Sequence, residues 1–192
     1  MTQPLAAPAS ITPLHPGTAE AECACALTGG LDRILADLQQ VLATLPAAAY
    51  CKAVGGESSV GAHMRHLLEF MQVLADNLES GVIDYESRAH NAAYESDPEA
   101  VAAILPQLHA KLTQAVLRLS AHHPLLLRET AFVGGRKITL TTSLGREILF
   151  MLQHAIHHLA IIKMQAAAMD IALGAQMGVA VATQIYREQL HG

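Results

Sequence analysis

Residues 143–170 are apolar on nearly every side when they are placed on a helix, and this limits the folds open to the chain. The apolar positions include Ile148, Leu149, Phe150, Met151, Leu152, Ile156, Leu159, Ile161 and Ile162. Gln153, three histidines and Lys163 interrupt the segment, which argues against a membrane span. We therefore predict a long helix that other elements of a helical domain cover on most sides.

Three further segments repeat apolar residues at steps of three and four positions, the spacing of an amphipathic helix. They cover residues 31–45, about 58–80 and about 97–121, and a short helix is predicted over about 179–189. Pro46 ends the first segment, while Gly29 and Gly30 argue against extending it upstream. Ser58 or Ser59 is a suitable N-cap for the second.

Residues 125–142 break this helical spacing. Two short strands are predicted over 130–133 and 138–142, on either side of a turn at Gly134 and Gly135. With four or five helices and mostly short connections, the predicted fold is all-α. It is an up-and-down four-helix bundle with a small β-hairpin before the last long helix.

Composition limits the class of protein. The chain has 192 residues, of which 52% are hydrophobic and 15% charged, so one globular domain is expected rather than a disordered tail or a collagen-like chain. Its net charge of -5 offers no basic surface, so no nucleic-acid partner is expected. Residues 1–17 contain four prolines and are expected to form a flexible segment before a domain over 18–192. They lack the features of a signal peptide, so we expect a cytoplasmic protein with reduced thiols and no membrane association.

Three cysteines, Cys23, Cys25 and Cys51, leave one unpaired in any internal disulfide scheme. Cys23 and Cys25 could chelate a metal, but a spacing of two residues near the start of a chain is a weak pattern. They are interpreted as small apolar residues.

Five of the eleven histidines fall within two of the predicted helices. His154 and His158 are four residues apart, about 40° around the helix axis and about 6 Å along it, so both can reach one metal ion. His157 points about 60° to the other side of His154, and a straight helix does not easily bring all three to one ion. The alternative is that these are polar groups satisfied inside a buried helix. Three imidazoles on so apolar a helix would each need a partner, which weakens that alternative.

A third ligand must come from another helix, and His63 and His66 are the candidates. His63 lies about 60° from the centre of the apolar stripe of its helix and His66 about 120°, so periodicity favours His63. Phe70 and Val73 flank the His66 side, however, and make that side apolar as well. Periodicity leaves both candidates open.

The residues around these histidines resemble a known family. The motifs are Ser59-Val60-Gly61-Ala62-His63-Met64-Arg65-His66-Leu67, Arg146-Glu147-Ile148-Leu149-Phe150 and His154-Ala155-Ile156-His157-His158. Further matching stretches are Ile83-Asp84-Tyr85-Glu86-Ser87-Arg88 with Glu95 downstream, and Gly178-Val179-Ala180. On these motifs, which span roughly residues 31–186, the chain resembles the DinB/YfiT-like superfamily of helical-bundle metalloproteins.

The resemblance implies a four-helix bundle, often dimeric, whose divalent metal is held by one histidine of the second helix and a later His-x-x-x-His pair. The helix-two ligand follows the motif glycine by five positions, which is His66 here, and the pair falls on His154 and His158. His63 and His157 are the runner-up ligands. Many members carry Arg after the last ligand, where this chain has Leu159, so the substrate side of the family site is not carried over.

Neutral imidazoles suit borderline ions such as Zn, Ni or Fe, and three nitrogen ligands with an open position are typical of a catalytic site. Such an ion lowers the pKa of water or a thiol at the open position and so provides a nucleophile. Members of the family include thiol S-transferases, isomerases and proposed hydrolases. The resemblance thus implies a metal-dependent S-transferase or hydrolase with a small-molecule or thiol substrate. The alternatives are a metal-binding or interaction module without turnover and a metal-free helical dimer.

Glu147, Arg88 and Tyr85 are further candidate catalytic residues. Glu147 is about 20° from His154 but about 10.5 Å along the axis, too far to share an ion. It could orient His66 or touch substrate, although an acid in a first helical turn also suits the helix dipole. Arg88 could bind an anionic substrate or form a solvated salt bridge. Tyr85 could supply a proton or simply pack.

A homodimer is also predicted. Four apolar residues lie on the back of the last long helix, away from the proposed site: Leu149, Leu152, Ile156 and Leu159. They need cover, which a second copy or another helix of the same chain would provide.

Overall fold

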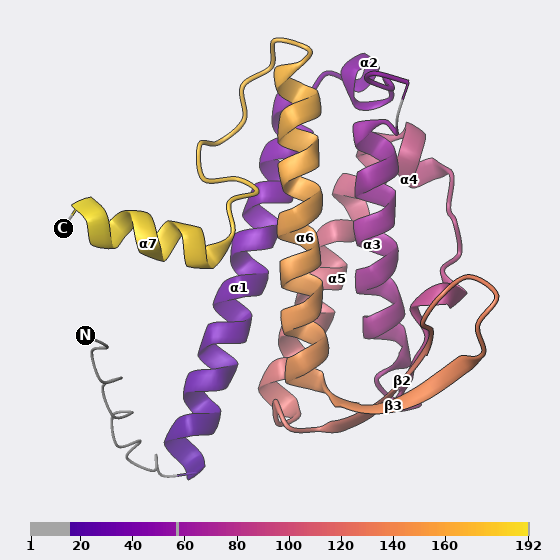
Figure 1. Ribbon diagram of the computed structural model, residues 1–192, viewed down its shortest axis with the longest axis vertical. Helices are drawn as coiled ribbons and strands as arrows, with labels where there is room; N and C mark the ends of the chain where they lie inside the picture. The colour runs from indigo at the N-terminus through magenta and orange to yellow at the C-terminus, as the bar shows by residue number, and fades with distance from the viewer. Residues whose placement is uncertain (1–15, 57, 192) are drawn as a thin grey trace, which may run out of the picture.

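The computed structural model describes residues 16–56 and 58–191, and shows a mainly helical fold with a small three-stranded sheet (Figure 1). Its elements are α1 (Pro16–Thr44), α2 (Ala47–Tyr50), α3 (Val60–Asn77), β1 (Val82–Ile83), η1 (Tyr85–Ser87), α4 (Ala93–Ser96), α5 (Pro98–Arg118), β2 (Pro124–Thr130), β3 (Lys137–Ser143), α6 (Leu144–Ala167) and α7 (Val181–His191). The prediction of a mainly helical chain is confirmed.

The four longest helices pack around one apolar core. Helix α1 packs against α5 and α6, and α3 packs against the same two helices. All four contribute fully buried side chains to this core, including Leu38, Met64, Leu105 and Ile148. Helices α3 and α6 are therefore neighbours, although the rest of the fold separates them in sequence.

The N-caps of three long helices explain where these helices begin. Ser59 Oγ accepts a hydrogen bond from the backbone N–H of Ala62 at 3.0 Å at the start of α3. Asp97 caps α5 in the same way, and Ser143 caps α6. The sequence offers Ser58 or Ser59 as this cap, and in the structure it is Ser59.

Helix α1 is longer than the sequence predicts, because it begins at Pro16 and runs through Gly29 and Gly30. A Cβ at Gly30 would collide with the side chain of Leu152 on α6, so the absence of a side chain permits close packing of the two helices. This contact stabilises a helix that two glycines would weaken in isolation. Of the segment predicted to be flexible, residues 1–15 lie outside the described residues.

The sheet has the order β1-β2-β3, with β2 and β3 antiparallel and the short β1 parallel to β2. Strand β2 ends at Thr130, which pairs with Lys137, so the connection is longer than the predicted turn at Gly134 and Gly135. The prediction of Phe132 and Val133 in a strand is wrong. Both lie in the connection, 70% and 103% exposed, because pairing ends before them.

Helix α6 ends at Ala167, and the chain then folds back along it before α7. Gly178 lies against the backbone of Leu159 and Ala160, where a Cβ would collide. Helix α7 then projects away from the other helices (Figure 1). None of the described helices has a stretch both long and apolar enough to span a bilayer.

The back of α6 is covered mainly by the same chain, one of the two possibilities that the sequence leaves open. Leu152 and Leu159 are 7% and 0% exposed within the single chain, and Ile156 is partly buried. Only Leu149 of the four predicted residues is strongly exposed, at 45%. Packing against α1 and the returning segment supplies most of this cover.

Candidate metal centre

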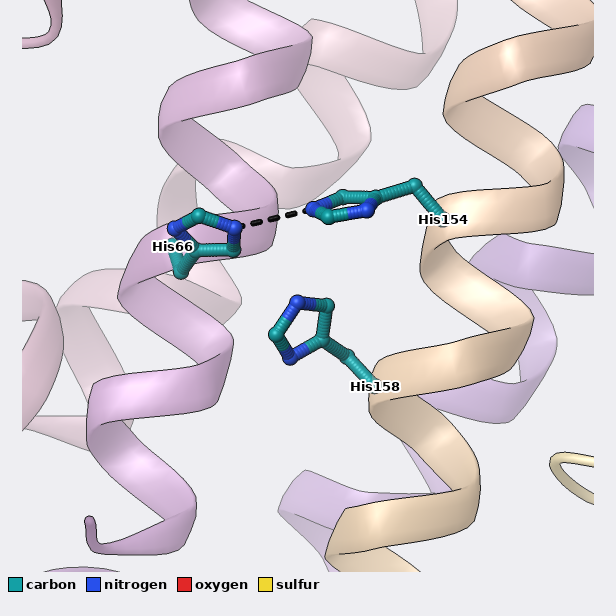
Figure 2. A group of neighbouring side chains, drawn as sticks. All are labelled: His66, His154 and His158. Atoms are coloured by element: carbon teal, nitrogen blue, oxygen red, sulfur yellow. Dashed lines mark hydrogen bonds between the residues drawn. The ribbon is translucent and has the colours of Figure 1, made fainter. Parts of the chain in front are cut away.

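Three histidine side chains from two helices meet between α3 and α6 (Figure 2). His66 comes from α3, and His154 and His158 come from α6. Nε2 of His66 lies 2.8 Å from Nε2 of His154, and one ligand atom from each of the three residues lies within 4.8 Å of the other two. In the described part of the chain, this is the one group of three or more His, Cys, Asp or Glu residues with that property. The cluster could therefore hold a metal ion.

Helical geometry explains why His154 and His158 lie side by side. His154 and His158 are one turn apart on α6, with ring centroids separated by 4.6 Å. The third ring depends on the packing of α3 against α6, which joins buried residues such as Leu67 and Met151 in one core. His66 and His154 are 88 positions apart, so no local spacing could show that they meet.

The surroundings keep the three imidazoles neutral. Burial and then the neighbouring histidines lower the pKa of His158 to about 3. Burial, followed by His154 and Arg88, lowers the pKa of His66 to about 4. Burial, followed by His157 and Arg88, also lowers the pKa of His154. Near pH 7 each ring therefore has a lone pair available for a metal. Each ring is only half-buried, which leaves the cluster accessible to solvent.

The two runner-up histidines occupy different places. His63 Nδ1 lies 2.9 Å from Nδ1 of His158, so His63 contacts the cluster through one of its members. His157 is exposed, and its ring meets His158 edge-on with centroids 5.3 Å apart. Both His63 and His66 face α6, which is why periodicity could not choose between them.

Two phenylalanines hold two of the three imidazoles. Phe70, one turn after His66, has its ring centroid 4.7 Å from that of His66 and 4.6 Å from that of His154. Phe150, one turn before His154, stacks on it at 5.7 Å and 18°. Sequence reasoning assigned neither contact, although the four-residue spacing on each helix was a signal for it.

Tyr85 and Glu147 form a buried pair beside these rings. Tyr85 Oη donates to Glu147 Oε2 at 2.9 Å, and Thr142 Oγ1 donates to Glu147 Oε1 at 2.6 Å. The Tyr85 ring also stacks on Phe70 at 4.7 Å. Burial and then Glu147 raise the pKa of Tyr85 well above its ordinary value, so its hydroxyl keeps its proton. The partners of Glu147 are thus Tyr85 and Thr142, and not His66.

Arg88 places a positive charge next to the cluster. Its guanidinium carbon lies 4.8 Å from the centroid of the Phe70 ring, and Nη1 donates to the carbonyl oxygen of Tyr85 at 2.7 Å. Arg88 Nε lies 3.9 Å from Oε2 of the buried Glu69 but has no hydrogen-bond partner among the described residues. The side chain is 20% exposed, so part of the guanidinium faces solvent.

Other candidates from the sequence lie away from this cluster. Glu95 pairs with Arg65, with Oε2 2.5 Å from Nη1. Cys23 and Cys25 are exposed free thiols on α1, where two-residue spacing turns them to different sides of the helix. Cys51 is also free and exposed, and donates to the carbonyl oxygen of Ser96.

A cavity of about 300 Å³ lies between the sheet and the start of α6. Its lining is mixed polar and apolar: Tyr85, Leu127, Glu129, Leu140, Thr141, Thr142, Arg146, Glu147 and Phe150. Because Phe150 also stacks on His154, the cavity and the histidine cluster share this ring.

The fold and the cluster define a helical protein with a candidate metal centre between two of its helices. The sequence profile of the DinB superfamily matches residues 31–162, which include all three histidines. The chain belongs to the DinB superfamily. Searches of curated proteins and of solved structures gave no match.

The donor set fits the divalent metal that is associated with this family. All three groups are imidazoles with lowered pKa values, and two of their Nε2 atoms are already close enough to share an ion. The two Nε2 atoms at 2.8 Å either form an N–H···N hydrogen bond or, when both present lone pairs, can hold a cation between them.

Proposed function

We propose that this chain is a metal-dependent enzyme in which His66, His154 and His158 hold one divalent ion and leave a position open. The observation that carries the proposal is the convergence of three half-buried, neutral imidazoles from α3 and α6. Imidazole nitrogen suits Zn, Ni or Fe. A set of three protein ligands with solvent access is typical of catalytic rather than structural zinc sites.

The reaction class that we propose is thiol S-transfer or hydrolysis of a small-molecule substrate. An ion held by three imidazoles supplies Lewis acidity and lowers the pKa of water or a thiol at the open position. Arg88 would bind an anionic group of the substrate, because its guanidinium is partly exposed. The carboxylate of Glu69 lies 3.9 Å from Nε and so neutralises the positive charge of Arg88 only in part. Phe70 and Phe150 orient the rings of His66 and His154 through their ring contacts.

Glu147 and Tyr85 are positioning residues in this proposal. The carboxylate accepts two hydrogen bonds, and the hydroxyl keeps its proton near neutral pH, so neither group is set up to transfer a proton. This observation favours a second candidate function, a metal-binding module without turnover. A metal-free helical dimer is the third.

The family membership supports a finer architecture as well. We propose that α1, α3, α5 and α6 form the up-and-down four-helix bundle of the superfamily, with β2 and β3 as the hairpin before its last helix.

We also propose a homodimer. Helix α7 exposes Val181, Ile185, Tyr186 and Leu190, and these residues occupy one half of its circumference. An apolar cavity of about 630 Å³ lies beside it, between α1, α6 and residues 176–184. A second copy that places its α7 there would cover both surfaces symmetrically.

Metal content per chain tests the central proposal. Protein purified without an affinity tag is expected to contain about one divalent ion per chain, and His158→Ala is expected to lose it. His157→Ala is the matched control, since His157 is the exposed neighbour. Elemental analysis that finds no stoichiometric metal would leave only the metal-free dimer. Full metal content in His158→Ala would remove His158 from the site.

A further inference from the structure

A fourth histidine extends the candidate metal centre away from the converging rings. His63 lies one turn before His66 on α3, and its Nδ1 is 2.9 Å from Nδ1 of His158. Figure 2 shows that one ring nitrogen of His158 points toward His66 and His154 while the other points away from them. Since Nδ1 contacts His63, Nε2 is the nitrogen of His158 that remains for an ion.

The tautomer of each ring follows from the nitrogen that must bind the metal. A neutral imidazole has one N–H and one lone pair, and a metal ligand must present the lone pair. If His158 binds an ion through Nε2, its proton is on Nδ1, and this N–H donates to the lone pair on Nδ1 of His63. The His63 proton is then on Nε2.

His158 also lacks the support that the other two rings receive. Phe70 contacts His66 and His154, and Phe150 stacks on His154. In the described chain the ring contacts of His158 are all with other histidines: His63, His66, His154 and His157. Only His63 among them makes a hydrogen bond to it. This bond is therefore the hydrogen bond that directs the His158 ring.

We propose that His63 is a positioning residue. Its Nδ1 accepts a hydrogen bond from the Nδ1–H of His158 and thereby holds Nε2 of His158 toward the metal. This inference rests on the proposed metal site. Partners of this kind fix the tautomer and the direction of a ligating histidine, and their loss typically weakens metal binding by about 10–100-fold.

The test compares two kinds of substitution at one position. His63→Ala and His63→Leu remove the acceptor, whereas His63→Asn keeps an acceptor oxygen close to the position of Nδ1. Zn²⁺ affinity is measured at pH 8 by competition with a chromophoric chelator, and circular dichroism checks the fold of each variant. We expect a stoichiometry of about one ion per chain throughout, affinity reduced about 10–100-fold in the acceptor-free variants and restored to near wild type in His63→Asn. His157→Ala, on the exposed neighbour, is expected to bind like wild type.

Three results would overturn the inference while leaving the metal site intact. These are wild-type affinity in both acceptor-free variants, equally weak binding in His63→Asn, and a complete loss of the ion matching that in His158→Ala, which would make His63 a ligand. A wild-type protein that binds no Zn²⁺ would instead overturn the proposed function, and this inference with it. A long-range ¹H–¹⁵N spectrum of metal-free protein gives an independent readout. In this spectrum the ring proton of His158 is expected on Nδ1 in wild type and in His63→Asn.

Discussion

The Nε2 atoms of His66 and His154 lie 2.8 Å apart across the interface between α3 and α6. At this distance the N–H of one neutral imidazole can donate to the lone pair of the other, or a cation can lie between two lone pairs. Burial lowers the pKa of both rings and so disfavours a second proton on either of them. The contact therefore links the packing of two helices to the chemistry of the candidate site.

Metal binding is expected to stabilise the fold. A ligand that binds only the native state adds about 2.7 kcal/mol at a hundredfold excess over its Kd, so Zn²⁺ should raise the Tm of wild type. His66→Ala should abolish this rise, because it removes the only ligand that α3 supplies. His122→Ala, at an exposed position, is the control. Scanning calorimetry measures the Tm of each variant with and without Zn²⁺. An equal rise in the Tm of His66→Ala would contradict the assignment of His66.

The metal-free protein is expected to lose stability as the pH falls below about 6.5. The native pKa values of His66 and His158 are about 4 and 3, against an ordinary value of 6.5. Between these values the unfolded chain binds more protons than the native chain, so acid favours unfolding. Urea unfolding at pH 7.5 and pH 5 in the presence of a chelator measures the loss. A double variant, His66→Gln with His158→Gln, should show a smaller loss; an unchanged pH dependence would refute this explanation.

Tyr85→Phe is expected to destabilise the protein by about 1–3 kcal/mol, because it leaves a buried oxygen of Glu147 without its donor. Glu147→Gln should reduce the free energy of unfolding by at least as much. The amide would point an N–H donor at Tyr85 or Thr142, whose hydroxyls are themselves the donors to this side chain. A double-mutant cycle by chemical denaturation measures the coupling. Additive effects would show that the two residues do not act as a pair.

Gly61→Ala is expected to destabilise α3 strongly, by about 1–3 kcal/mol or more. The added Cβ would collide with the backbone carbonyl of Glu95 and with the ring of Tyr50. Gly29→Ala is the matched helical control, because no other described part of the chain lies within 4 Å of its Cβ position, and it should stabilise α1 by about 0.5–1 kcal/mol. Thermal unfolding of both variants checks the difference, and a neutral Gly61→Ala would contradict the predicted collision.

The proposed dimer predicts that Ile185→Glu is monomeric. A charge on the exposed apolar side of α7 would oppose its burial in a partner. Light scattering at micromolar concentration measures the mass of the variant beside wild type. Arg187→Glu, on the polar side of α7, should keep the wild-type mass. A monomeric wild type would end the proposal.

The long helices and the three histidines could be predicted because their signals are local or come from the family motif. The cap of α3 and the His154–His158 spacing each depend on residues within one or two turns. The extension of α1 across Gly29 and Gly30 could not be predicted, because it depends on contact with Leu152 of α6. Helix propensity alone opposes it.

The surroundings of the candidate site were harder to predict than its ligands. The role of Glu147 depends on Tyr85, which lies 62 positions away, and that of His63 depends on His158, 95 positions away. A helical wheel places His63 on a face but does not say which atom it meets. Such contacts are set by how α3 and α6 pack, and the sequence of neither helix contains that information alone.

An ion held between α3 and α6 would act as a reversible cross-link, because its ligands are 88 positions apart. Opening either helix would then require release of the ion. The amide protons of both helices should exchange with solvent together in the loaded protein and separately after chelation. Metal binding would thus make α3 and α6 open as one cooperative unit.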